Sequence, residues 1–250
     1  MEGTLTVAED VDTFSVNFFV GPDWPFGGLT TDEEKEYVKV QPGMPAGYDD
    51  WLTNGWLNYL VPWAPGSPQD PVALTSNRGS TATFQFKDCR NGWTYSGSAR
   101  TTLIGDGNGH MMDAHVNSTL EGDTNTFDME VTNIPFAVYD VIFYLGSNVA
   151  HYGDGTGVIV FTGGPERAFT VENKAFDGTF TEMVDATTLG NYIVYTGVTG
   201  SSFTTQTWGT GPNGFNHLGL FGFQIRAGSN DYTIWAENWP EADLSDPDAD

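Results

Sequence analysis

Two short acidic segments are the first places in the chain where residue types and spacing could support chemistry. GDGNGH runs from Gly105 to His110, and YGDGTG runs from Tyr152 to Gly157. Oxygen-bearing side chains alternate with glycine in both, and Ca²⁺ binds about six to eight oxygens, including backbone carbonyls that glycine lets turn inward. The predicted metal ligands are Asp106, Asn108 and Asp154. Neither segment has the full EF-hand pattern, and Asp-Gly or Asn-Gly hairpin turns explain the same letters at least as well.

Aromatic side chains predict a second kind of site, one for carbohydrate. The chain has 8 Trp and 10 Tyr, a heavy load for so polar a sequence. Their rings offer flat apolar faces with an N–H or O–H at the edge, which complements the apolar faces and hydroxyl edges of sugars. Any single Trp is more often buried in a core, but Gly, Pro and Asn around Trp24 and Trp208 indicate loops. The predicted ligand-binding residues are Trp24, Tyr48, Trp63, Trp93, Trp208 and Asn213.

Signals for catalysis are weak. In HMMDAH, His110 and His115 are spaced for neither a zinc-protease helix nor one face of a strand. No G-x-S-x-G segment occurs. Asp128 and Glu130 in FDMEV would share one face of a strand, which would bring their carboxylates close together, as the catalytic pair of a glycosidase requires. Acids on an exposed sheet face, however, are usually only solvated. We therefore favour binding without catalysis and leave an enzyme as an open alternative.

The elements that must position these residues are predicted to be strands. TFSVNFF places Phe14, Val16 and Phe18 on one face, and ATFQF does the same for Phe84 and Phe86. Further β-rich runs, each bounded by Gly, Asn, Asp or Pro, are VYDVIFYL, VIVFT, AFTV, NYIVYT, SFTTQT and GLFGFQIRA. Many short strands with turn signals between them predict an all-β jelly-roll sandwich.

Two other features interrupt this strand pattern. The region from Gln41 to Ala73 combines many Gly and Pro residues with five Trp or Tyr side chains, and it predicts a long, packed, aromatic-rich loop. Within it, prolines recur every three residues in PWAPGSPQDP, which favours an extended polyproline segment. Short helices are expected at Thr30–Lys39 and Asp231–Trp239.

The charge of the chain excludes several partners. The net charge is −24, from 9 basic and 33 acidic residues, so the surface repels nucleic acid and anionic membranes. No apolar run is long enough to span a bilayer. We interpret the acidity as typical of a secreted protein from a marine or salty environment, the alternative being an ordinary acidic soluble domain. The same acidity favours a neutral glycan over a sulfated one. The single cysteine, Cys89, allows no disulfide within the chain.

Several segments, taken in order, resemble one family. They are SVNFF, MPAGYDDWLTNGW, FDMEVTNIPFAVYDVIFYL, FDGTF, GNYIVYTGVTGSSFT and GLFGFQIRA. The pattern resembles a β-rich extracellular module of Verrucomicrobia and Planctomycetes that often sits beside glycoside hydrolases, sulfatases or cell-surface sorting signals. The resemblance implies a jelly-roll sandwich of the carbohydrate-binding kind, but no specific ligand residues. The final segment, TIWAENWPEADLSDPDAD, resembles the linker before a thrombospondin type 3 calcium repeat.

These observations predict a sandwich module over residues 3–228 and an acidic linker over 229–250, as part of a larger multidomain protein. The predicted function is non-catalytic binding of a polysaccharide or oligosaccharide through loop aromatics, with structural calcium, in a secreted or cell-surface protein. The alternatives are a structural or adhesive surface module and a glycan-degrading enzyme on the same fold. The sequence leaves the glycan, the number of calcium ions and the oligomeric state open.

Overall fold

The computed structural model describes residues 11–19, 39–61, 68–88, 91–94, 106–117, 127–147, 154–172, 174–209 and 218–228. The strands are β1 (Thr13–Phe19), β2 (Trp56–Leu60), β3 (Val72–Thr75), β4 (Thr81–Asp88), β5 (Asn91–Thr94), β6 (Ala114–Asn117), β7 (Phe127–Thr132), β8 (Val138–Ser147), β9 (Gly155–Phe161), β10 (Arg167–Val171), β11 (Leu189–Gly190), β12 (Tyr192–Thr199), β13 (Ser202–Gly209) and β14 (Leu218–Ala227). The same ranges contain a single-turn 3-10 helix, η1 (Asp49–Trp51), and a short α-helix, α2 (Gly107–Met111). None of the described helices is long and apolar enough to cross a membrane.

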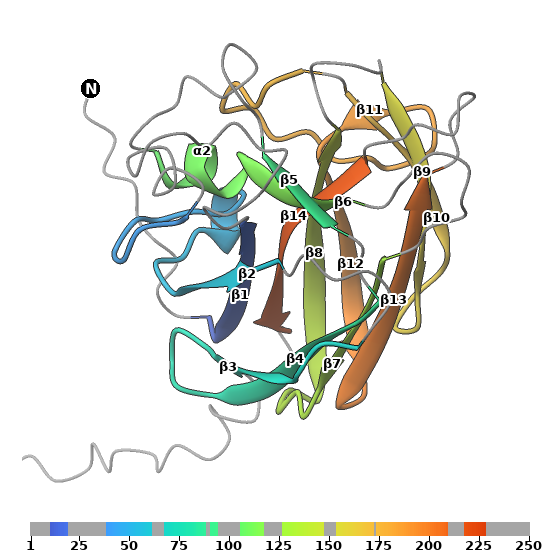
Figure 1. Ribbon diagram of the computed structural model, residues 1–250. Helices are drawn as coiled ribbons and strands as arrows, with labels where there is room; N and C mark the ends of the chain where they lie inside the picture. The colour runs from blue at the N-terminus through green and yellow to red at the C-terminus, as the bar shows by residue number, and fades with distance from the viewer. Residues whose placement is uncertain are drawn as a thin grey trace, which may run out of the picture.

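The strands form two seven-stranded sheets. Sheet 1 has the order β12-β8-β14-β1-β2, with β6 paired to β14 and β5 paired to β6, and sheet 2 has the order β11-β10-β9-β13-β7-β4-β3. The chain crosses repeatedly between the sheets, from β7 to β8 to β9 and again from β12 to β13 to β14. Figure 1 shows β1, β14 and β8 in the middle of the molecule, with sheet 2 running from β3 at the bottom to β9 at the right. The predicted all-β jelly-roll sandwich is confirmed.

The main core lies between the two sheets. Phe18 of β1 contacts Phe84 and Phe86 of β4, with ring centroids 5.8 and 5.2 Å apart. The predicted groupings on β1 and β4 are therefore correct, because all five of these apolar side chains are fully buried. Strand alternation explains the pattern, since every second residue of a strand points to the same face. Each such ring contributes about 1.5–3 kcal/mol of burial free energy.

A second apolar cluster covers the outer face of sheet 1. Its buried members are Val40, Ala46, Trp51, Met111, Met112, Ile142, Tyr144, Phe176, Tyr192 and Phe221. The apolar run of β8 explains this layer: Val141 and Phe143 face the main core while Ile142 and Tyr144 face outward, so both faces of the strand need cover. The cover comes from the segment after residue 39, from α2 and from the segment that contains Phe176.

The expected loop over Gln41–Ala73 is wrong in part. The region contains η1, the strand β2 and the start of β3. β2 pairs in parallel with β1, which places Tyr59 opposite Phe18. Leu57 and Tyr59 pack against the main core, so the aromatic content of this region reflects a half-buried strand. Residues 62–67, which hold two of the four prolines of the repeat, lie outside the described residues, as do almost all of Thr30–Lys39 and all of Asp231–Trp239. The division of the chain at residue 228 stays a prediction.

Candidate functional site

A pocket lies beside the second cluster, where β8 and β14 meet the segment 174–181. It is small and partly open, with about 30 Å³ of space accessible to a water-sized molecule. Its apolar lining consists of Met112, Leu145, Phe176 and Phe221, and its polar lining consists of Glu172, Lys174, Thr179, Thr181 and Asn191. Gly146 and Gly190 complete the wall, and a Cβ at Gly146 would collide with the Phe221 ring. The pocket thus combines apolar and polar side chains in a shallow depression.

Asn191 fixes the polar rim of this pocket. Its Oδ1 accepts a hydrogen bond from the Thr181 N–H at 2.9 Å, and its Nδ2 donates to the Thr179 carbonyl oxygen at 2.8 Å. Asp177 closes the turn before Thr179 by accepting that residue's N–H at 2.9 Å. This bond is the main reason that the pKa of Asp177 lies below its usual value. The rim is therefore held by side-chain bonds to backbone rather than by a regular strand.

The charges on the rim are paired. The Lys174 ammonium lies 2.8 Å from a Glu172 carboxylate oxygen and 3.4 Å from an Asp177 carboxylate oxygen. The bond to Glu172 is the largest cause that raises the pKa of Lys174, and Asp177 adds to it. All three side chains are more than two-fifths exposed, so the pairs add little to folding stability while their charges remain accessible to a ligand.

Four aromatic rings extend the surface from this pocket, and we call them the ring cluster: Phe176, Phe180, Tyr48 and Tyr192. Phe176 in the pocket contacts Phe180 at 4.9 Å between centroids, and Phe180 contacts Tyr48 at 5.8 Å. Tyr48 stacks on Tyr192 at 4.6 Å with 29° between the ring planes. Phe176 and Tyr192 are buried, whereas Tyr48 and Phe180 are half-buried and present ring surface to solvent. The ring cluster therefore packs directly beside the pocket, through Phe176.

Acidic groups lie close to the ring cluster. Burial is the main cause that raises the pKa of Tyr192 well above its usual value, followed by its hydrogen bond with the Tyr48 hydroxyl. The charges of Glu182 and Asp49 raise the pKa of Tyr192 further. The Tyr192 phenol is thus a neutral hydrogen-bonding group at any ordinary pH.

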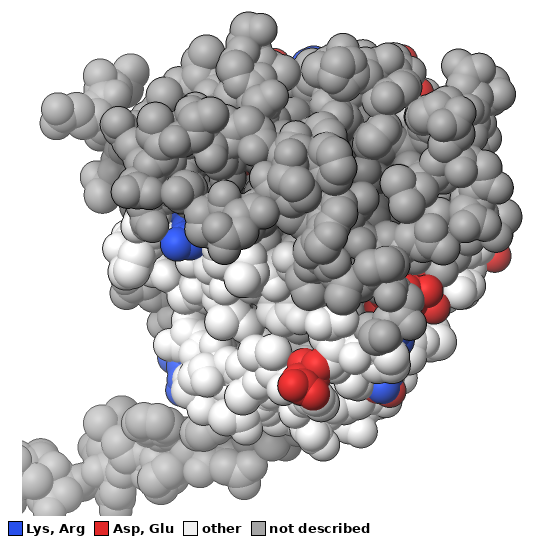
Figure 2. All heavy atoms as spheres, in the orientation of Figure 1, with Lys and Arg blue, Asp and Glu red and all other residues white. Residues whose placement is uncertain are grey.

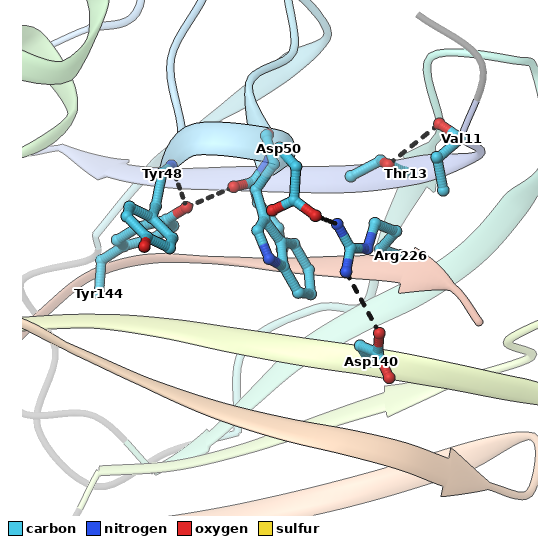
Figure 3. A network of polar contacts seen from close by, with 9 residues as sticks. Val11, Thr13, Tyr48, Asp50, Asp140, Tyr144 and Arg226 are labelled. Carbon is cyan, nitrogen blue, oxygen red and sulfur yellow. Dashed lines mark hydrogen bonds and ion pairs between the residues drawn. The ribbon is translucent and has the colours of Figure 1, made fainter. Parts of the chain in front are cut away.

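A buried relay holds the backbone of Tyr48 in place (Figure 3). The Tyr48 N–H donates to the Tyr144 hydroxyl at 3.0 Å, and that hydroxyl donates to Gln224 Oε1 at 2.6 Å. Gln224 Nε2 in turn donates to the Trp51 carbonyl oxygen and to Ser15 Oγ, each at 2.9 Å. Burial raises the pKa of Tyr144 strongly, so its hydroxyl keeps the proton that it donates. The relay ties η1 to β8, β14 and β1.

Trp51 anchors the same segment. The guanidinium of Arg226 lies 4.2 Å from the centroid of the Trp51 ring, within the range of a cation–π contact. Arg226 also pairs with Asp50 at 2.7 Å and with Asp140 at 3.4 Å, as the close view shows (Figure 3). Trp51 is only 4% exposed. It therefore stabilises η1 and leaves the solvent-facing role to Tyr48.

The predicted ligand-binding residues do not gather at one place. Tyr48 belongs to the ring cluster, on the outer side of sheet 1. Trp208 is half-buried on β13 and alternates with the inward-facing Thr205 and Thr207, so it lies on the outer face of sheet 2, across the core from Tyr48. Trp93 pairs with His115 between β5 and β6, but its side chain is outside the described residues, as are Trp24, Trp63 and Asn213.

The predicted metal ligands have structural partners in this arrangement. Asp106 caps α2 by accepting the Asn108 N–H at 2.8 Å, and Asn108 Oδ1 accepts the Gly47 N–H at 2.7 Å. The hairpin alternative for GDGNGH is therefore wrong, because the segment begins a helix. Asp154 is exposed directly before β9, and the glycines after it belong to that strand. The described ranges contain no group of three or more His, Cys, Asp or Glu side chains that could hold a metal, and calcium stays a prediction.

The two histidines of HMMDAH do not share a strand, contrary to expectation. His110 lies in α2 and His115 in β6, and both are buried. The ring Nδ1 of His110 lies 2.8 Å from the Lys39 carbonyl oxygen. The short helix separates the two side chains, which the five-residue spacing alone could not reveal.

The sequence reasoning missed most of the candidate site. Phe176, Phe180 and Lys174 were not predicted as site residues, although FDGTF is one of the segments that carries the family resemblance. The available signal was a pair of phenylalanines four residues apart around a Gly, outside any strand pattern. Phe has no N–H or O–H to hydrogen-bond a sugar, so its presence in a sequence predicts a sugar site less strongly than Trp or Tyr does.

Comparisons with known proteins add little to this picture. No protein-family model matches the sequence, and no curated protein matches it. Among solved structures, the chain is similar to the carbohydrate-binding module TmCBM61 in complex with beta-1,4-galactotriose, at 12% sequence identity. That similarity covers 60% of this chain and 73% of the other, with a TM-score of 0.24. A likeness this low assigns neither a fold nor a ligand to the chain.

Proposed function

We propose that this protein is a non-catalytic carbohydrate-binding module that binds an uncharged oligosaccharide or polysaccharide. One observation carries the proposal: a small pocket with apolar and polar lining lies beside the half-buried rings of Tyr48 and Phe180. Sugars need both kinds of surface, because their C–H faces pack on rings while their hydroxyls need hydrogen-bond partners.

The individual groups suit these roles. The hydroxyls of Thr179 and Thr181, the carboxylate of Glu172 and the ammonium of Lys174 can donate to or accept from sugar hydroxyls at the rim. The relay through Tyr144 fixes the backbone of Tyr48 before any ligand arrives. Such preorganisation lowers the entropic cost of binding, which supports recognition of a weakly held ligand such as a glycan.

The carboxylate pair considered for catalysis lies away from the pocket. Asp128 and Glu130 share the outer face of β7, as their spacing predicts. Glu130 pairs with Lys87 at 2.5 Å, and Asp128 accepts a hydrogen bond from Gln206 at 3.4 Å. These acids are therefore separated by the sandwich from the pocket that would hold a sugar.

The location of the protein, its multidomain context and its structural calcium are also proposals. The acidic composition and the family resemblance support a secreted or cell-surface location within a larger multidomain protein. Structural calcium rests on the oxygen-rich segments around Asp106, Asn108 and Asp154. Thermal unfolding with and without a chelator tests the calcium, since a bound ion raises the melting temperature by mass action.

The direct test of the proposed site is retention on immobilised β-linked galactan, mannan and glucan. We expect the wild type to be retained on at least one polymer, and Tyr48→Ala and Phe180→Ala each to weaken that binding about tenfold, the effect of removing a central aromatic contact. Thr204→Ala is the matched control, because its exposed side chain lies on the outer face of sheet 2. Trp208→Ala tests the competing platform on that face.

The outcomes distinguish carbohydrate binding itself from the position of the binding site. Retention on none of these polymers would contradict carbohydrate binding of the proposed kind. Retention that survives Tyr48→Ala and Phe180→Ala but disappears with Trp208→Ala would move the site to sheet 2. Retention with release of shorter sugars would identify an enzyme.

A further inference from the structure

We infer that the candidate site selects uncharged glycans over carboxylated ones, and that Glu172 and Asp177 impose this selection by neutralising Lys174. The inference rests on the proposed function, and it assigns that site a specificity and the residues that set it. Lys174 is the only Lys or Arg among the described residues that line the pocket. Its charge therefore decides whether a sugar carboxylate finds an electrostatic partner there.

The pairing of Lys174 removes that partner. The ammonium has three N–H donors, and the carboxylates of Glu172 and Asp177, at 2.8 and 3.4 Å, engage two directions of the group. The remaining donor suits a neutral hydroxyl oxygen. A sugar carboxylate would have to compete with two protein carboxylates for the same ammonium, whereas a hydroxyl can also donate to those carboxylates.

The net charge around Lys174 also disfavours a carboxylated sugar. Glu172 and Asp177 give two negative charges against the single positive charge of Lys174. Two cations elsewhere in the described ranges have acidic partners of their own, since Arg226 pairs with Asp50 and Asp140 while Lys87 pairs with Glu130. A carboxylated sugar in the pocket meets net repulsion.

This selection is local rather than a property of the whole acidic chain. The described acidic side chains on the face in Figure 2 are scattered among uncharged residues, and several lie next to basic ones. In about 0.15 M salt the Debye length is about 8 Å, so distant surface charges are largely screened while those at the pocket still act. Local substitutions can therefore separate the two effects.

The experiment uses chemically matched ligands. Whichever neutral hexose polymer retains the wild type is oxidised at its C6 hydroxyl to the carboxylate, and part of that product is converted to the methyl ester. In about 0.15 M salt we expect the wild type to bind the ester at least about tenfold more tightly than the free acid, as expected for like charges at short range in a partly exposed site. The ester controls for loss of the hydroxyl itself.

The decisive variant is Glu172→Gln with Asp177→Asn. It leaves Lys174 unpaired by these two side chains, and the amide oxygen introduced by Asp177→Asn can still accept the Thr179 N–H. We expect the ratio of its affinities for the free acid and the methyl ester to rise about tenfold relative to the wild type. Adding Lys174→Gln to this pair is expected to abolish that rise. Asp70→Asn with Glu166→Gln is the charge-matched control, since both acids are exposed and neither lines the pocket.

Each outcome decides the inference. Equal wild-type affinity for the acid and the ester would overturn the selectivity and leave carbohydrate binding standing. No rise of this ratio in the double variant, or an equal rise in its charge-matched control, would overturn the role of Glu172 and Asp177. Failure of the wild type to bind any neutral polymer would overturn the proposed function itself. Unchanged melting temperatures would show that every variant is folded.

Discussion

At the scale of single residues, Tyr48 is the predicted ligand-binding residue that lies in the ring cluster. Its ring stacks on Tyr192 and remains half-exposed, while its backbone N–H is bound by the buried hydroxyl of Tyr144. The buried Tyr144 hydroxyl thus helps to fix the position of the half-buried Tyr48 ring. Removing that atom should affect both stability and binding.

Tyr144→Phe tests this coupling. The substitution leaves the Tyr48 N–H and Gln224 Oε1 without their partner, and a buried unsatisfied group costs about 1–3 kcal/mol. We expect the free energy of unfolding to fall by about that amount and glycan affinity to fall several-fold, measured by urea unfolding and by retention. Tyr139→Phe is the control, because the Tyr139 hydroxyl is buried without a hydrogen bond in the described part of the chain. Equal losses from both variants would contradict the relay.

The residues that sequence reasoning could not recover share a physical cause. The exposure of a ring depends on what packs over it. Trp51 is therefore buried, whereas Tyr48, three residues before it, is half-buried. Arg226 is far from Trp51 in sequence, yet it lies over that ring. Contacts of this kind come from the pairing of strands distant in sequence, which local spacing does not encode.

At the scale of elements, the strands were largely predictable and the outer layer was not. Runs such as VYDVIFYL and GLFGFQIRA carry strong β signals and form the adjacent strands β8 and β14. β2 was missed because WLNYL lies between Gly- and Pro-rich stretches and alternates weakly. α2 was missed because GDGNGH has poor helix propensity, which the Asp106 cap and the tertiary bond between Asn108 and Gly47 override.

Gly107→Ala tests how far α2 supports the site. A Cβ at residue 107 would collide with the Pro45 carbonyl oxygen, so the segment that leads to Tyr48 would have to move. We expect a loss of about 1–3 kcal/mol in unfolding free energy, typical of overpacking, together with weaker glycan retention. Gly55→Ala is the matched control, since its new Cβ would find only ordinary contacts at 3.5 Å. Equal stability of the two variants would show that the α2 contact is dispensable.

At the scale of the whole molecule, the two sheets differ in how they meet solvent. Sheet 1 is buried on its inner face by the main core and on its outer face by the second cluster, whereas β7 and β13 of sheet 2 alternate buried residues with exposed or half-exposed ones. The candidate site therefore lies in the added layer, where loops can vary without disturbing the sandwich. The doubly covered sheet also explains why so many tyrosines are buried.

Those buried tyrosines predict an alkaline limit to stability. Burial raises the pKa of Tyr139 to about 12, and it is also the main cause that raises the pKa of Tyr195 to about 12, against the opposing charge of Arg167. An unfolded tyrosine releases its proton near pH 10, so above that pH the unfolded chain binds fewer protons than the folded one. The stabilisation is therefore fully present below about pH 10 and is lost as the pH rises towards about 12. Urea unfolding at rising pH should show this fall, and Tyr139→Phe should make it shallower, because one of the shifted groups is gone. A free energy of unfolding that stays constant from about pH 9 to about pH 11.5 would contradict the burial of these phenols.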